Sequence, residues 1–203
     1  TELGRPPRQG DEMPKDMEDY LFTNLRDDVC GYFMAQTSDE LCRRVGISRE
    51  QADNFAAKSH QKTERSISIG TWEQEIVEVE TPEGLVGYAD EDHVVIGTTE
   101  ESLSGLRTHF GPESLVTAGN ASGVVDGAAA LIVKSESRAA ADGDSPLTRI
   151  VSWGIVGLEP AIMAHGPVPS SILALEKAGL EASEIDLWEI NEAFAGQCVA
   201  CIK

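Results

Sequence analysis

The composition of the chain changes at one segment, Thr117-Ala-Gly-Asn-Ala-Ser-Gly-Val-Val-Asp-Gly-Ala-Ala-Ala130. The residues before it are polar and acidic. The residues after it are rich in Gly, Ala, Val and Ile, a composition typical of a buried α/β core. We therefore place a domain boundary near residue 117.

The same segment is a candidate ligand loop. Its small residues let a ligand approach the backbone closely, and Asn120 and Ser122 offer side-chain hydrogen-bond donors. The alternative is a tight structural turn that leads into a strand. The spacing of the residues alone favours this alternative.

Apolar runs and helical patterns alternate after the loop. Strands are predicted over residues 128–134, 147–156 and 185–190, the first two of them buried. Helices are predicted to about residue 141, from 167 to about 178 before Gly179, and from 192 to 202. Strands that alternate with helices indicate parallel crossover units, so the predicted fold class is α/β.

A long helix is predicted in the first part of the chain. Ser48 and Gln51 have the spacing of a capping box, so the helix runs from Arg49 to about Ser68, with Gly70 as its stop. Shorter helices are predicted over 39–45 and 100–107. The alternating residues 75–80 predict a half-buried strand.

Charge and length exclude several classes of protein. The chain has 203 residues, 35 acidic against 16 basic side chains and 41% hydrophobic residues. This hydrophobic content indicates a globular protein, and the net charge of -19 argues against binding to nucleic acid or to an anionic membrane. The longest apolar run is too short to span a bilayer and no leader pattern opens the chain, so a cytoplasmic location is expected.

The four cysteines are too few for a disulfide scaffold. Cys198 and Cys201 form a CxxC motif within a predicted helix, without a second cysteine pair. Packing inside the protein is therefore favoured over metal binding or redox chemistry, and no metal site is predicted.

The junction Trp188-Glu-Ile-Asn-Glu-Ala-Phe-Ala195 carries a polar pair at the end of a predicted strand. Ligands of α/β sheets bind at the carboxyl ends of strands, and the Asn191 amide could hold a water or carbonyl oxygen as an oxyanion site requires. The alternative is that Asn191 caps the following helix. Both roles can hold at once.

His165 lies in the turn Met163-Ala-His-Gly-Pro-Val-Pro169. An imidazole there could act in acid or base catalysis. A lone histidine in a turn is more often a surface residue, and this second interpretation is favoured.

Several strings together resemble one family, the thiolases, which make or cleave 3-oxoacyl-CoA thioesters. The strings occur in the family's order and rough spacing over most of the chain. They are Ile47-Ser-Arg-Glu-Gln51, Gly119 to Ala130, Ile150-Val-Ser-Trp153, Gly166-Pro-Val-Pro169 and Asn191-Glu-Ala-Phe194.

The resemblance implies a fold and its division into domains. The implied architecture is part of a five-layered αβαβα fold. Residues 1–118 would form a loop domain that faces coenzyme A, residues 119–146 the end of the first thiolase half, and residues 147–203 the start of the second. Proteins of this family are about twice as long, so we expect the chain to be an internal piece of one.

The resemblance also implies chemistry. In the family a cysteine attacks the acyl thioester, a histidine activates it, and a second cysteine moves a proton. None of the strings that carry these groups occurs here, so we assign no catalytic cysteine and expect this chain alone to be inactive. Asn191 matches the family's oxyanion-hole asparagine. Matches to coenzyme A and acyl-chain contacts are Met34, Ala118, Ser122, Met163 and Phe194.

The implied function is acyl transfer between 3-oxoacyl-CoA or acetyl-CoA and coenzyme A, which serves as a substrate, with no other cofactor. A homodimer or homotetramer is expected. A non-catalytic relative that binds acyl-CoA or has a structural role is the alternative. A 3-oxoacyl synthase is a third candidate, but the string Asn191-Glu-Ala-Phe194 argues against it.

Overall fold

The computed structural model describes residues 23–82, 84–87, 93–125 and 127–203, and most of its regular structure is helical. The α-helices are α2 (Met34–Val45), α3 (Arg49–Ser68), α4 (Glu100–Ser104), α5 (Glu136–Asp142), α6 (Pro167–Ala178) and α7 (Ala195–Ile202). The described residues also form three short 3-10 helices: η1 (Thr71–Gln74), η3 (Pro160–His165) and η4 (Ala182–Glu184).

Helix α3 has the bounds that the sequence predicts. The Ser48 hydroxyl accepts from the backbone N–H of Gln51 at 3.2 Å, and the Gln51 side chain accepts from the backbone N–H of Ser48 at 2.9 Å. This reciprocal pair satisfies two donors that the first turn of a helix leaves free. Gly70 follows the end of α3 with a φ of 72°, a conformation that other residues rarely adopt.

The other helices agree with the predictions in place but not always in length. Helices α5 and α6 lie where the patterns put them, and α6 is followed by Gly179. Helix α2 begins at Met34 rather than at residue 39, because Thr37 and Ser38 are buried in its first turns despite their weak helical propensity. The prediction for 100–107 is wrong beyond Ser104, where α4 ends.

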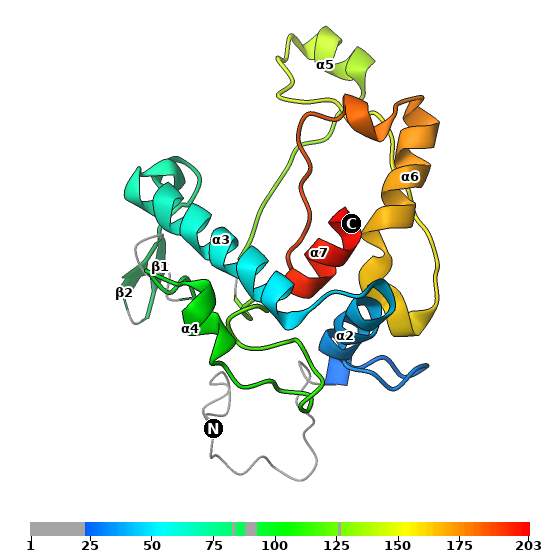
Figure 1. The fold of residues 1–203 in the computed structure, drawn as a ribbon. Helices are drawn as coiled ribbons and strands as arrows, with labels where there is room; N and C mark the ends of the chain where they lie inside the picture. The colour runs from blue at the N-terminus through cyan, green and yellow to red at the C-terminus, as the bar shows by residue number, and fades with distance from the viewer. Residues whose placement is uncertain (1–22, 83, 88–92, 126) are drawn as a thin grey trace, which may run out of the picture.

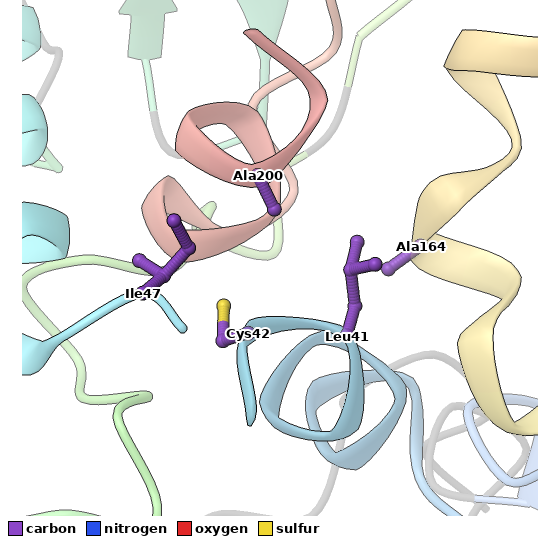
Figure 2. Packing of buried hydrophobic residues seen from close by; sticks show 5 residues of the cluster. All are labelled: Leu41, Cys42, Ile47, Ala164 and Ala200. Carbon is purple, nitrogen blue, oxygen red and sulfur yellow. The ribbon is translucent and has the colours of Figure 1, made fainter. Parts of the chain in front are cut away.

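Small residues let three helical segments pack closely in the first part of the core. Figure 2 shows Leu41 of α2 pointing towards Ala164 of η3, with Cys42 and Ile47 close to Ala200 of α7. These five residues are almost completely buried. Helix α2 therefore packs against both η3 and α7.

A second buried cluster joins α3 to α4 and α7. It consists of Ala52, Ala56 and Ala57 of α3, Leu103 of α4 and Ala195 of α7. The face of α3 that carries Ala52, Phe55, Ala56 and Ser59 is thus the inner face, as the sequence predicts, with Phe55 and Ser59 half-buried. Helix α7 contacts both clusters and holds the helices together.

The strand predictions are mostly wrong. Residues 128–134, 147–156 and 185–190 are extended but unpaired among the described residues, and Leu131, Ile132 and Leu147 are at least 89% exposed. A strand is stable only when a neighbour pairs with its backbone, and the described part of the chain supplies no such neighbour. The parallel crossover units are therefore not formed within it.

The described residues contain one sheet, an antiparallel hairpin of β1 (Val79–Thr81) and β2 (Gly84–Val86). Only the last part of the strand predicted over 75–80 forms, and most of it is exposed rather than half-buried. Two consecutive strands can pair locally, which explains why this one sheet is present.

Figure 1 shows an open arrangement. Helices α2, α3, α4 and α7 gather in one part, α5 lies far from them, and long extended segments connect the two regions. No helix in the described ranges has the length and apolar character needed to cross a membrane.

Candidate functional site

The structure brings together two of the segments that the sequence singles out. Ala121 and Phe194 form an antiparallel bridge. The Ser122 N–H donates to the carbonyl of Ala193 at 2.9 Å, and the Ala195 N–H donates to the carbonyl of Asn120 at 2.9 Å. The small-residue loop thus lies against the start of α7.

Asn120 fixes the shape of this loop. Its side-chain oxygen accepts from the Thr117 N–H at 2.8 Å, and its side-chain nitrogen donates to the carbonyl of Leu115 at 2.9 Å. Asn120 and Thr117 are both buried. The segment is therefore a tight turn, as the alternative interpretation has it, and the turn also sets the positions of Ala118 and Ser122.

A buried charge pair of α3 lies beneath the loop. The Asp53 carboxylate accepts from Nε of Arg49 at 2.6 Å and from the Asn120 amide at 2.8 Å. Asp53 is 1% exposed. Burial of a carboxylate is costly unless it is paired and hydrogen-bonded, and both of its oxygens have partners here.

A hollow of about 210 Å³ lies beside the contact between the loop and α7. Its lining includes His60, Ser122, Gly123 and Glu192. His60 Nε2 is 3.2 Å from the carbonyl of Gly119, and the Ser59 hydroxyl donates to the Glu192 carboxylate at 2.6 Å. Helix α3 therefore contacts both segments that border the hollow.

The predicted site residues fall into two groups. Ser122 and Phe194 meet at the bridge, while Asn191 and Ala118 lie exposed in the same two segments. The alternative that Asn191 caps α7 is wrong, because α7 begins at Ala195 with Phe194 at its N-cap. Asn191 thus lies four residues before the first residue of the helix and is exposed.

Met34 and Met163 belong to elements that pack on each other, away from the bridge. Met34 is the first residue of α2 and is half-buried, and Met163 lies in η3 and is 43% exposed. The buried contact between Leu41 and Ala164 joins these two elements (Figure 2). The structure therefore places the two methionines on neighbouring elements but not at the loop.

Three of the four cysteines are poor nucleophiles in this environment. Burial raises the pKa of the Cys42 thiol to about 11. Burial, together with the nearby charge of Glu192, raises that of Cys198 to about 12. Burial also raises the pKa of Cys201. Cys198 and Cys201 lie in α7 and pack within the protein, as the sequence predicts. All four thiols are free.

Other features do not add to this site. A larger hollow of about 600 Å³ opens between α3 and the end of α7, and it contains none of the predicted site residues. His165 ends η3 and is half-buried rather than a surface residue, and its Nδ1 has no partner among the described residues. The structure does not bring His165 to the bridge.

Sequence reasoning missed the four residues of α3 that contact the site: Arg49, Asp53, Ser59 and His60. One signal was present. Asp53 stands next to the apolar Ala52 and three residues before Ala56, so it lies at the border of the buried face of the predicted helix. A charged residue at such a position indicates a buried partner.

Two family models match the chain in succession. The thiolase N-terminal domain matches residues 4–137, and the thiolase C-terminal domain matches residues 144–203. The chain belongs to the thiolase family. The predicted fold class, part of the thiolase fold, is confirmed by the similarity of this chain to a solved thiolase structure.

Named relatives are similar over most of the chain. A 3-ketoacyl-CoA thiolase of Cronobacter sakazakii is 49% identical over 174 residues, which are 84% of this chain and 45% of that protein. An acetyl-CoA acetyltransferase of Rhizobium meliloti is 44% identical over 181 residues, 88% of this chain and 46% of that protein. The chain thus spans about half the length of the curated thiolases that it matches.

The likeness extends to three dimensions. The crystal structure of human mitochondrial 3-ketoacyl-CoA thiolase in complex with CoA is 38% identical, with a TM-score of 0.84. The match covers 97% of this chain and 50% of the human chain. The extended segments of this thiolase chain are therefore part of its family's fold, although they are unpaired among the described residues.

Proposed function

We propose that this thiolase chain contributes to an enzyme that transfers an acyl group between 3-oxoacyl-CoA or acetyl-CoA and coenzyme A. The reaction would run as thiolysis or as Claisen condensation through an acyl-cysteine. Family membership and the names of the relatives support this proposal. Coenzyme A would be a substrate, and no separate cofactor is invoked.

The observation that carries the proposal is the bridge between Ala121 and Phe194. It holds Ser122 beside the segment that contains Asn191. Ser122, which would bind coenzyme A, and Asn191, which would face the reacting carbonyl, therefore belong to one site. In this site Ala118 and Ser122 would contact the pantetheine arm, and Phe194 would form a wall. Met34 and Met163 would line the acyl pocket, where flexible thioethers suit chains of different length.

Asn191 would act on the oxyanion of the thioester. Its amide N–H can donate to a water or directly to the carbonyl oxygen on which negative charge develops. Its exposed side chain has no hydrogen-bond partner among the described residues, so it is free to face a ligand. Asn191 is therefore our candidate catalytic residue.

The acyl-cysteine would come from outside residues 1–203. The thiolate is the nucleophilic form of cysteine, and the raised pKa values of Cys42, Cys198 and Cys201 keep these thiols protonated at neutral pH. In thiolysis the cysteine sulfur would attack the 3-oxo carbon, the bond between C2 and C3 would break, and acetyl-CoA would leave after its C2 takes a proton. The thiol of coenzyme A would then attack the acyl-cysteine, and the cysteine sulfur would leave. We expect this chain alone to be inactive.

The proposal is tested on the native protein at its natural length, with acetoacetyl-CoA and coenzyme A as probes. We expect thiolysis, and a loss in kcat of about 10²–10³ in Asn191→Ala, the effect of removing one oxyanion donor. Asn54→Ala is the matched control. It removes the amide of another asparagine, which lies on α3 and donates to Glu100 at 2.7 Å, outside the proposed site.

The mass of the native protein separates the two candidate functions. A mass near twice 21.8 kDa with turnover supports a thiolase of ordinary length. A protein of 21.8 kDa that binds coenzyme A esters without turnover would instead support a non-catalytic acyl-CoA-binding relative.

Three further statements stay predictions. We propose that residues 1–118 form the loop domain that faces coenzyme A, with 119–146 and 147–203 belonging to the two thiolase halves. A homodimer or homotetramer and a cytoplasmic location are also proposed. Size-exclusion chromatography with light scattering and cell fractionation test these last two.

A further inference from the structure

Asp53 is one of three groups, with the Leu115 carbonyl and the Thr117 N–H, that fix which way the amide of Asn120 faces. An ionised carboxylate only accepts hydrogen bonds, so the NH₂ end of Asn120 must turn towards Asp53, where the distance is 2.8 Å. The opposite end, the amide oxygen, then faces the Thr117 N–H at 2.8 Å. A flipped amide would lose both hydrogen bonds at once.

Arg49 holds the Asp53 carboxylate in place. Its Nε donates to the second Asp53 oxygen at 2.6 Å, while its Nη2 donates to the carbonyl of Leu103 at 2.7 Å and to that of Leu106 at 3.2 Å. The guanidinium is thus anchored by the end of α4 as well as by α3. A planar, multiply bonded Arg restricts the position of its carboxylate partner more than a single point charge does.

The hydrogen bonds of Arg49, Asp53 and Asn120 therefore connect helix α3 to the exposed loop. Asp53 and Asn120 are 1% and 5% exposed, whereas Ala118 and Ser122 on the same loop are exposed. The loop is also tied to α7 by the hydrogen bond from the Ala195 N–H to the Asn120 carbonyl. The side chain of Asn120 thus links α3 to the turn, and its backbone links the turn to α7.

We propose that Asp53 is a positioning residue of the coenzyme A site, which acts through Asn120 to hold residues 117–122 in the conformation that binds the pantetheine arm. This inference rests on the proposed function for the identity of the ligand. Asp53 itself is buried and touches no ligand.

The test compares Asp53→Asn with the wild type in the native protein at its natural length. A neutral amide at position 53 accepts a weaker hydrogen bond than a carboxylate and can turn its own donors towards Asn120, so the link from α3 to the Asn120 side chain is weakened while Leu115 and Thr117 still bond that side chain. We expect the KM for coenzyme A to rise about tenfold to a hundredfold, the range that a lost buried hydrogen bond implies, with kcat nearly unchanged. Hydrogen exchange of residues 115–123 should accelerate while that of α6 stays the same.

Two further variants keep the test decisive. Asn120→Ala leaves the pair of Arg49 and Asp53 intact and removes the link to α3 together with the side-chain hydrogen bonds to Leu115 and Thr117, so it should raise the KM at least as much as Asp53→Asn does. Glu100→Gln is the matched control, because it makes the same carboxylate-to-amide change against Asn54, away from the loop. Its KM should equal that of the wild type.

The outcomes distinguish this inference from the proposed function. If the wild type neither binds coenzyme A in calorimetry nor turns over acetoacetyl-CoA, the proposed function fails. If the wild type does both, and folded Asp53→Asn and Asn120→Ala keep its KM, the inference about Asp53 is overturned. A lower melting temperature with an unchanged KM would likewise overturn it, since Asp53 would then serve stability alone.

Discussion

Gly196 of α7 faces the sulfur of Cys42 on α2 so closely that a β-carbon at position 196 would lie 2.8 Å from Sγ. Real β-carbons essentially never approach another atom this closely. The same β-carbon would meet Ala52 of α3 at 3.8 Å. The meeting of three helices thus depends on a residue without a side chain.

Gly196→Ala should destabilise the protein by about 1–2 kcal/mol. Overpacking of a core costs about 1–3 kcal/mol, and the better helical propensity of Ala offsets part of it. Urea unfolding at equilibrium measures the effect. Adding Cys42→Ala makes room for the new methyl group, so the double variant should lose less than the sum of the single variants. Strict additivity would contradict the contact.

The thiols should react with iodoacetamide in an order set by burial. At pH 8 a pKa of about 11 for Cys42 leaves roughly one thiolate in a thousand, and about 12 for Cys198 leaves fewer still. Cys30 is half-buried and should be labelled first in a mass-spectrometric time course. Labelling of Cys198 as fast as Cys30 in the folded protein would contradict these environments, and Cys30→Ser identifies the first peak.

An ion pair between α2 and η3 should make stability depend on pH. Arg44 donates to both carboxylate oxygens of Glu159, at 2.6 and 2.7 Å, and lowers the pKa of Glu159 below its ordinary value of 4.5. A lowered folded pKa stabilises the protein above the unfolded value, and this contribution is lost as the pH falls through the folded value.

Glu159→Gln should therefore lower the melting temperature at pH 7, and this loss should shrink to nothing as the pH falls through the lowered folded pKa, because the wild-type carboxyl is then protonated as well. The effect at pH 7 should also shrink in 1 M NaCl, because both side chains are partly exposed and salt screens such charges. Glu189→Gln is the control, an exposed carboxylate in none of the described ion pairs. A loss that stays constant as the pH falls from 7 until the Glu159 carboxyl is protonated would argue against the ion pair.

Gly154 marks the place where an extended segment meets α6. A β-carbon there would overlap the backbone carbonyl of Ser170, which cannot rotate away as a side chain can. Next to it, the Ser152 hydroxyl donates to the carbonyl of Ala174 at 2.6 Å. Gly154→Ala should cost about 3 kcal/mol, the upper part of the overpacking range. Gly157→Ala, with nothing within 4 Å of its β-carbon, should be nearly neutral in the same urea titration.

Local interactions explain which predictions from the sequence succeed. The ends of α3 depend on the capping pair of Ser48 and Gln51 and on Gly70, all within a few residues of the helix they bound. The start of α6 at Pro167 and its end before Gly179 are local in the same way. Such signals can be interpreted without knowledge of the rest of the fold.

Long-range partners explain which predictions fail. The apolar run around Leu131 has strand composition, but pairing depends on neighbours that no local pattern specifies. The site shows the same limit. The strings around Ser122 and Asn191 could be found in the sequence, whereas the contact between Asp53 and Asn120 spans 67 residues and required the fold.

The bridge between Ala121 and Phe194 has a consequence for the order of folding. It joins residues about 70 positions apart, and the free-energy cost of closing such a loop is met before the contact itself stabilises the chain. Helices such as α3 form from contacts within a few residues on a much shorter timescale. We therefore expect the helices to form early and the two halves of the proposed ligand site to meet only in the last stages of folding.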